Sequence, residues 1–135
     1  VLEVDENSAQ ITGNVQTGAI LVDGLGVGDV GNIVLRDRQH LAEDGIMIVV
    51  MTLERHSNVV LAGPDIVSRG FVYVRESEDL MGHAREVVEQ ALDSCMDRNI
   101  TDWGKIKLVV KDAVGDYLWK RTKRRPMILP IIMEA

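Results

Sequence analysis

The sequence predicts an α+β fold in which two helices pack on a three-stranded sheet, in the order β-β-α-α-β. Three patterns predict it: strand-like apolar runs at 46–53 and 66–74, helical spacing of apolar residues between 80 and 118, and a closing apolar run at 127–133. Short apolar runs predict buried strands, whereas apolar residues three and four positions apart predict a helix. Residues 46–135 are therefore expected to fold as one domain.

The composition is that of a globular protein and excludes several classes. Hydrophobic residues make up 46% of the 135 residues and charged residues 27%, which suffices for a packed core. One cysteine excludes an intramolecular disulfide framework and a zinc cluster built from cysteines. No apolar run reaches the ~18–20 residues of a membrane helix. Because the chain begins with Val1 and no signal peptide follows, we expect a piece of a longer cytoplasmic protein without membrane contact.

The first strands of the domain differ in their patterns. The run 46–53 is apolar almost throughout, which is typical of a strand covered on both faces. Residues 59–62 resume the sheet, and Pro64 then indicates an edge strand or a bulge. The next strand is expected at 66–74, with a bulge at Gly70.

Two helices are expected after these strands. Ser77 is the expected N-cap of the first helix, and the second begins at Thr101 or Asp102. Pro126 prevents the second helix from continuing. The first helix places on one face Leu80, Ala84, Val87, Val88, Ala91, Leu92 and Cys95. The second helix places on one face Trp103, Ile106, Val110, Ala113, Val114, Tyr117 and Leu118.

The first third of the chain has a different pattern. Residues 1–31 predict short strands joined by turns, one of them at 19–22, a piece too small to bury its own apolar faces. Residues 32–45 predict a linker with a short helix near 34–43 that ends at Gly45.

A glycine-rich stretch at 26–31 has the pattern G-x-G-x-x-G. A strand at 19–23 before it and a helix after it would give the order of a dinucleotide-binding βαβ unit. Against this, Glu54 lies further along the chain than the usual ~20 residues, and no further βαβ units follow. We favour a tightly turned connector and keep a nucleotide-binding unit at 26–31 as an alternative.

No group of residues predicts catalysis or metal binding. The histidines His40, His56 and His83 are scattered and are expected at the surface. Cys95 falls on the apolar face of the first helix, so a buried thiol is expected there. Ser68 lacks the G-x-S-x-G context of a nucleophile. We therefore assign no catalytic residue and no metal ligand.

The most informative polar feature is a run of five cations in six residues: Lys120, Arg121, Lys123, Arg124 and Arg125. Like charges this close repel one another, so a compensating negative partner is expected. Contact with another protein surface, or a solvated helix end, is one reading. Contact with an RNA backbone is the other.

Several long blocks resemble the C-terminal portion of bacterial ribonuclease J. They are Gly24 to Arg38, Leu41 to Gly45, Ser68 to Ser77 and Lys123 to Ile132. Members of that family are metallo-β-lactamase/β-CASP nucleases, which hydrolyse RNA from the 5′ end and internally with zinc-activated water. The resemblance covers nearly the whole chain.

The resemblance implies a division of the chain and a supporting role. Residues 1–31 would be the closing strands of the β-lactamase-like domain, 32–45 the linker, and 46–135 the small C-terminal domain. That domain supports dimer and tetramer assembly and full activity in the family. The family's zinc ligands lie in an H-x-H-x-D-H motif, which this sequence lacks. Zinc and RNA are therefore expected of the parent enzyme rather than of this segment.

The expected partners are accordingly the rest of a ribonuclease J chain and further copies of it. The strand edges around 46–53 and 65–74 are the expected contact surfaces. An accessory RNA-binding surface at 120–125 is the alternative role.

Overall fold

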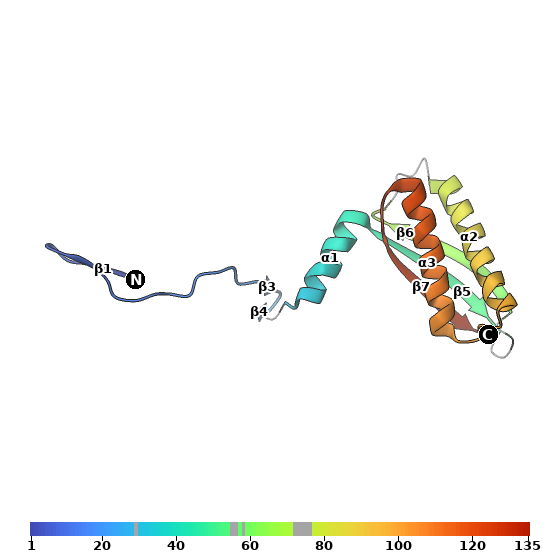
Figure 1. Ribbon diagram of the computed structural model, residues 1–135, viewed down its shortest axis with the longest axis horizontal. Coiled ribbons are helices and arrows are strands. Elements are labelled where there is room, and N and C mark those ends of the chain that lie inside the picture. The colour runs from blue at the N-terminus through green and yellow to red at the C-terminus, as the bar shows by residue number, and fades with distance from the viewer. Residues whose placement is uncertain (29, 55–56, 58, 72–76) are drawn as a thin grey trace. The chain divides into compact units, whose positions relative to one another are not determined.

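The structure is a computed structural model that describes residues 1–28, 30–54, 57, 59–71 and 77–135. It contains two compact units, Val1–Leu35 and Arg36–Ala135. The second unit is the larger and holds the sheet and helices that the sequence predicts (Figure 1).

The second unit is built on a three-stranded sheet. After the helix α1 (Asn32–Asp44), its elements are β5 (Ile46–Leu53), β6 (Val60–Arg69), α2 (Ser77–Asp97), α3 (Trp103–Thr122) and β7 (Met127–Glu134). The strand order is β6-β5-β7, with β5 antiparallel to β6 and parallel to β7. The predicted α+β fold and its β-β-α-α-β order are confirmed.

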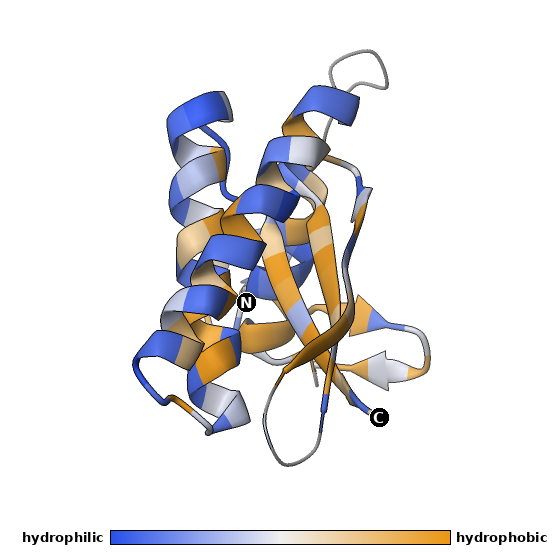
Figure 2. Cartoon of the chain, turned by 90° about the vertical axis from the view of Figure 1, so that its right-hand side faces the viewer, coloured by the Kyte–Doolittle hydropathy of each residue, from blue (hydrophilic) through white to orange (hydrophobic). Residues whose placement is uncertain are grey.

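One face of the sheet packs against α2 and α3 and forms the core. Alternate residues of β5 point into it, and Met47, Val49, Met51 and Leu53 are all 0% exposed. Figure 2 shows the strands largely hydrophobic and the helices polar on part of their surface. Both predicted helical stripes pack here, contributing buried Leu80, Ala84, Val88, Ala91, Leu92, Cys95, Ile106, Val110, Val114 and Leu118.

The ends of α3 are fixed by local hydrogen bonds. The Asp102 side chain accepts a hydrogen bond of 2.8 Å from the backbone N–H of Lys105, so Asp102 is the N-cap. The helix itself begins at Trp103, one residue after the later of the two predicted starts. Lys123 adopts the left-handed conformation (φ 58°) and its N–H donates to the Trp119 carbonyl. The helix thus ends at Thr122, before Pro126 is reached, because its C-cap has already turned the chain.

The outer strand β6 differs from the predictions in two respects. β6 is one strand from Val60 to Arg69 that runs through Pro64, with a register irregularity opposite, between Val50 and Thr52. Pro64 lies on an edge strand, as predicted. Gly70 follows the end of β6 rather than forming a bulge within it, and the predicted strand residues 72–74 lie outside the described residues.

The position and covering of β5 also differ from the predictions. The segment 46–53 was expected to offer a strand edge, but β7 returns to its free side, so β5 is central. It was also expected to be covered on both faces, whereas α2 and α3 lie on one. The other face retains half-buried Ile46, Ile48, Val50 and Thr52.

The helix α1 (Asn32–Asp44) leads into β5 and is longer than the predicted 34–43. It ends at Gly45, as predicted, because Gly45 has φ 76° and lies against backbone. A Cβ placed there would be 2.5 Å from the Arg69 carbonyl oxygen. Only glycine fits this conformation and this approach.

The first unit holds two short hairpins, built from β1 (Leu2–Val4), β2 (Ala9–Ile11), β3 (Val22–Asp23) and β4 (Gly26–Val27). The strand predicted at 19–22 forms only at its end. β3 and β4 pair only with each other, whereas β5 belongs to the three-stranded sheet. A βαβ unit needs two parallel strands in one sheet, on either side of the helix. The alternative prediction of a nucleotide-binding βαβ unit at 26–31 is therefore wrong.

Candidate functional site

The second face of the three-stranded sheet is apolar and accessible. Its β5 residues are the half-buried Ile46, Ile48, Val50 and Thr52, and the opposing β7 residues are Met127, Leu129, Ile131 and Met133. Leu129 is 46% exposed and Met133 54% exposed, and Val67 on β6 is 42% exposed. We call this surface the open face. Large apolar side chains gathered on one surface are typical of an interaction site.

Two opposite charges flank the apolar part of the open face on β6. Arg69 lies opposite Ile46, Val67 opposite Ile48 and Asp65 opposite Val50. Residues directly opposite each other on antiparallel strands share a face. The open face therefore carries a cation and an anion at equal spacing from Val67, and both are exposed.

Each outer strand of the sheet contains a proline. Pro64 lies within β6, and Pro130 lies near the middle of β7. Proline lacks an N–H group, so it removes a donor from a strand and interrupts pairing with an added strand. Sheet extension along either edge is therefore disfavoured, and the open face is the better contact surface.

Of the five predicted cations, Lys120 and Arg121 lie in the last turn of α3, and Lys123, Arg124 and Arg125 lie between α3 and β7. All five are exposed, and we call residues 120–125 the cationic turn. Arg121 pairs with Asp79 of α2 at 3.6 Å, and Arg124 donates to the Phe71 carbonyl at 3.4 Å. These two contacts tie the turn to α2 and to the segment after β6.

The remaining contacts of the cationic turn involve Trp119. The Lys123 ammonium lies 5.6 Å from the centre of the Trp119 ring, and the Arg125 guanidinium lies 4.7 Å from it. Both distances fit a cation–π interaction. The sequence shows Trp119 beside the cations but not this stacking, which depends on the Lys123 turn. The prediction that Lys120, Arg121, Lys123, Arg124 and Arg125 contact RNA or a partner stays a prediction.

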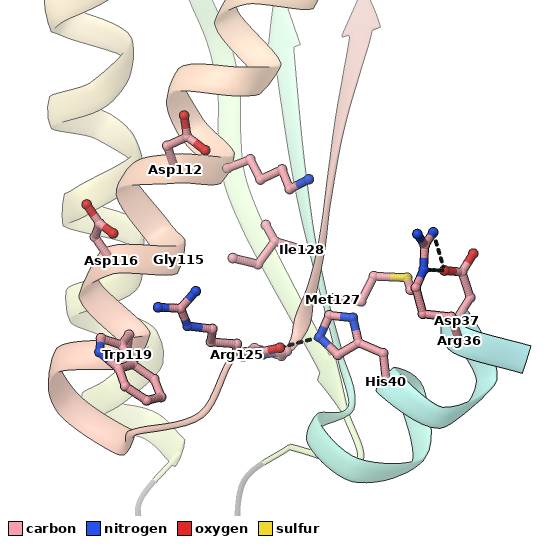
Figure 3. Close-up of a pocket in the computed structure, with 12 residues that line it drawn as sticks. Arg36, Asp37, His40, Asp112, Gly115, Asp116, Trp119, Arg125, Met127 and Ile128 are labelled. Atoms are coloured by element: carbon pink, nitrogen blue, oxygen red, sulfur yellow. Dashed lines mark hydrogen bonds and ion pairs between the residues drawn. The ribbon is translucent and has the colours of Figure 1, made fainter. Parts of the chain in front are cut away.

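The histidines have separate local roles. His40 Nε2 donates to the Arg125 carbonyl oxygen at 2.5 Å, which joins α1 to the cationic turn (Figure 3). His83 Nδ1 donates to the Asp79 carbonyl at 2.8 Å, one turn earlier in α2. His56 lies outside the described residues. Ser68 lies on β6, and Arg69 donates to its carbonyl.

Cys95 is buried in the core, as predicted, and is 2% exposed. Burial raises the pKa of its thiol, because the thiolate would lose solvation, while nearby Arg98 lowers it by less. This environment favours the unreactive thiol.

Within the described part of the chain, no three side chains of His, Cys, Asp or Glu are placed to hold a metal ion together. The zinc that the family resemblance implies therefore has no fitting donor set among these residues. No helix of the described residues is long and apolar enough to cross a membrane.

The fold and this surface define a class: a small two-layer α+β domain whose helices cover one face of a three-stranded sheet and leave the other accessible. Comparison with known proteins identifies the family within that class. The ribonuclease J C-terminal domain family matches residues 33–135, and the chain belongs to it.

Named relatives agree with this assignment. Ribonuclease J2 of Bacillus subtilis (strain 168) is 48% identical over 135 residues, which are 100% of this chain and 24% of that protein. Ribonuclease J 2 of Staphylococcus aureus (strain NCTC 8325 / PS 47) is 52% identical over 120 residues, 89% of this chain and 22% of that protein. Ribonuclease J 2 of Staphylococcus epidermidis is 53% identical over the same length. The chain thus spans about a quarter of the length of these relatives.

Proposed function

We propose that residues 36–135 are a non-catalytic assembly domain of a zinc-dependent ribonuclease that acts on RNA from the 5′ end and internally in the cytoplasm. The parent chain supplies the zinc ligands and the RNA cleft. This domain supports activity by joining chains into dimers or tetramers. The open face carries the proposal, because β5 is apolar on both sides and the chain's own helices cover only one.

The occupant of the open face is a second copy of this domain. Two such sheets can face each other across a two-fold axis that lies between them and runs perpendicular to the strands. In this arrangement β6 of one copy lies over β6 of the other, and the two strands run in opposite directions. Arg69 of each copy then meets Asp65 of the other, with Val67 near the axis. Such self-complementarity is the property that a two-fold interface requires.

The size of the open face sets the expected strength. Three strands at ~4.8 Å spacing and eight residues at ~3.3 Å give a patch of roughly 14 Å by 26 Å. This is roughly 400 Å² per copy, about half of the ~800 Å² per partner in a standard stable interface. We expect an isolated chain to self-associate weakly, with a dissociation constant on the order of 10–100 μM.

Sedimentation equilibrium tests this proposal. The wild-type chain should show a monomer–dimer equilibrium, and the double variant Leu129→Lys/Ile131→Lys should remain a monomer at all concentrations. Leu108 is a matched control: it is 56% exposed but lies on α3, away from the open face. Leu108→Lys should dimerise like the wild type. A wild-type chain that stays monomeric at several hundred micromolar contradicts the proposal, and so does equal dimerisation of the double variant.

A second candidate function is RNA-backbone contact by the cationic turn, favoured by the exposure of all five cations. Replacing Arg121, Lys123, Arg124 and Arg125 with Gln should weaken RNA binding by the parent enzyme. It should also flatten the salt dependence by ~0.7 per lost phosphate contact on single-stranded RNA. Unchanged affinity and slope would exclude this function.

A further inference from the structure

A groove of about 640 Å³ lies between α1 and α3, over the start of β7. Figure 3 shows residues that line it: Arg36, Asp37 and His40 come from α1, and Asp112, Gly115, Asp116 and Trp119 come from α3. Arg125 enters between the two helices, and Ile128 of β7 lies at the floor. The groove therefore combines cations, carboxylates and an aromatic ring from three elements.

The walls of the groove are held in place by contacts within the chain. The Arg125 carbonyl accepts the hydrogen bond from His40, and the Arg125 guanidinium stacks on Trp119. One residue thus joins α1 to α3. Trp119 carries both Arg125 and Lys123 over its ring and still stays 40% exposed, so part of the ring remains accessible.

The α3 side of the groove contains a glycine, Gly115, in the interior of the helix. A Cβ at Gly115 would lie 3.5 Å from Ile128 Cδ1, an ordinary contact, so packing does not require glycine here. A glycine inside a helix costs stability relative to alanine. Its absent side chain instead deepens the groove.

The lining has the chemistry that one nucleotide requires. An accessible indole and a planar guanidinium can both stack on a base. Lys111 supplies charge for a phosphate, whereas Arg36 pairs with Asp37 at 3.1 Å and Arg125 stacks on Trp119. Carboxylates such as Asp112 and Asp116 accept hydrogen bonds from ribose hydroxyls or base amino groups. Three carboxylates make the groove unsuited to a polyphosphate alone.

We propose that the groove between α1 and α3 binds one nucleotide of single-stranded RNA, with the base on Trp119 and the phosphate near Lys111. The site is separate from the open face, so failure of self-association leaves this inference intact. The groove shares Arg125 with the cationic turn, but it differs from backbone contact there because it depends on Trp119, Lys111 and Gly115.

Binding of a fluorescein-labelled oligoadenylate RNA ten-mer to the full 135-residue chain tests the site by anisotropy. Trp119→Ala should weaken binding by about 5- to 100-fold, the range for losing one base–aromatic stack. Lys111→Gln should weaken it and reduce the salt slope by ~0.7, whereas the equally charged change Lys120→Gln should weaken it less. A single-tryptophan chain carrying Trp103→Phe should show quenching of Trp119 emission by the same RNA.

The glycine provides a second test that is independent of charge. Gly115→Leu should fill the groove and abolish Trp119 quenching, with thermal unfolding confirming that the variant is folded. Gly82→Leu is the control, because Gly82 lies within α2 and a Cβ there would meet nothing within 4 Å. It should bind RNA like the wild type.

Other results overturn the inference. They are no binding of the ten-mer at millimolar concentration, equal binding by Trp119→Ala, or equal loss from Lys111→Gln and Lys120→Gln. Loss of self-association in Trp119→Ala without RNA binding would assign the groove to a protein contact and also overturn it. Quenching by adenosine 5′-monophosphate as strong as by the ten-mer would support the nucleotide site and identify a free nucleotide as its source.

Discussion

The two faces of β5 differ in their environment although both carry mainly apolar side chains. Met47, Val49, Met51 and Leu53 are fully buried against α2 and α3, whereas Ile46, Ile48, Val50 and Thr52 are half-buried on the open face. Burial of apolar area stabilises a fold by about 25 cal/mol per Å². Folding provides this stabilisation on the face that packs against α2 and α3. Assembly with a second copy would provide it on the open face.

Neighbouring residues of β5 offer the largest test of this comparison. Met51→Ala should cost about 2–5 kcal/mol of unfolding free energy, since it leaves a cavity in the core. Val50→Ala, one residue earlier and on the open face, should cost about 1 kcal/mol, measured by urea unfolding at a concentration where the chain is monomeric. Equal losses at the two positions would contradict the assignment of the faces.

The core between the sheet and the two helices contains the Tyr117 hydroxyl, and its removal should change the unfolding free energy by less. The Tyr117 hydroxyl oxygen is buried and has no hydrogen-bond partner among the described residues, and burial raises the pKa of Tyr117. Deleting an unsatisfied buried hydroxyl removes a desolvation cost. Tyr117→Phe should leave stability unchanged or raise it by up to ~1 kcal/mol. A loss above ~1 kcal/mol would show that the hydroxyl has a partner.

The smallest expected effect is in the first unit, where the stability of the turn at Asp5 should depend on pH. The Asp5 carboxylate accepts hydrogen bonds from the N–H groups of Asn7 and Ser8 and from the Ser8 hydroxyl. The Asn7 bond contributes most to lowering the pKa of Asp5. A lowered folded-state pKa means that the turn is stabilised above the unfolded pKa and loses this as pH falls through the folded value. NMR shifts of the Asn7 and Ser8 amides should change there, and amides unaffected by acid would exclude the bonds.

Much of the second unit could be predicted from the sequence, for identifiable reasons. The stripe from Ile106 to Leu118 recurs at helical spacing because those residues share one packed face. Gly45 was recognisable as the end of α1 because a left-handed backbone at a helix end selects glycine. The start of α3 was predicted to within one residue, at Thr101 or Asp102. Cys95 was placed correctly by the periodicity of its helix.

The features that escaped prediction depend on pairing between distant segments. The apolar run 46–53 predicts a strand with two apolar faces, but it does not indicate whether helices of this chain cover both of them. The open face could therefore not be predicted from the sequence. The return of β7 beside β5 made the expected edge a central strand. The stacking of Arg125 on Trp119, and hence the groove, depends on the left-handed turn at Lys123, a residue type that rarely adopts it.

Methionine oxidation tests the open face most directly, because the chain holds an internal pair of probes. Met133 lies on the open face and is 54% exposed, and Met96 lies on α2 and is 38% exposed. Oxidation by hydrogen peroxide follows exposure. If two copies meet through the open face, oxidation of Met133 slows as protein concentration rises, while oxidation of Met96 does not change. Protection of Met96 instead, or equal Met133 oxidation at all concentrations, would contradict assembly through this surface.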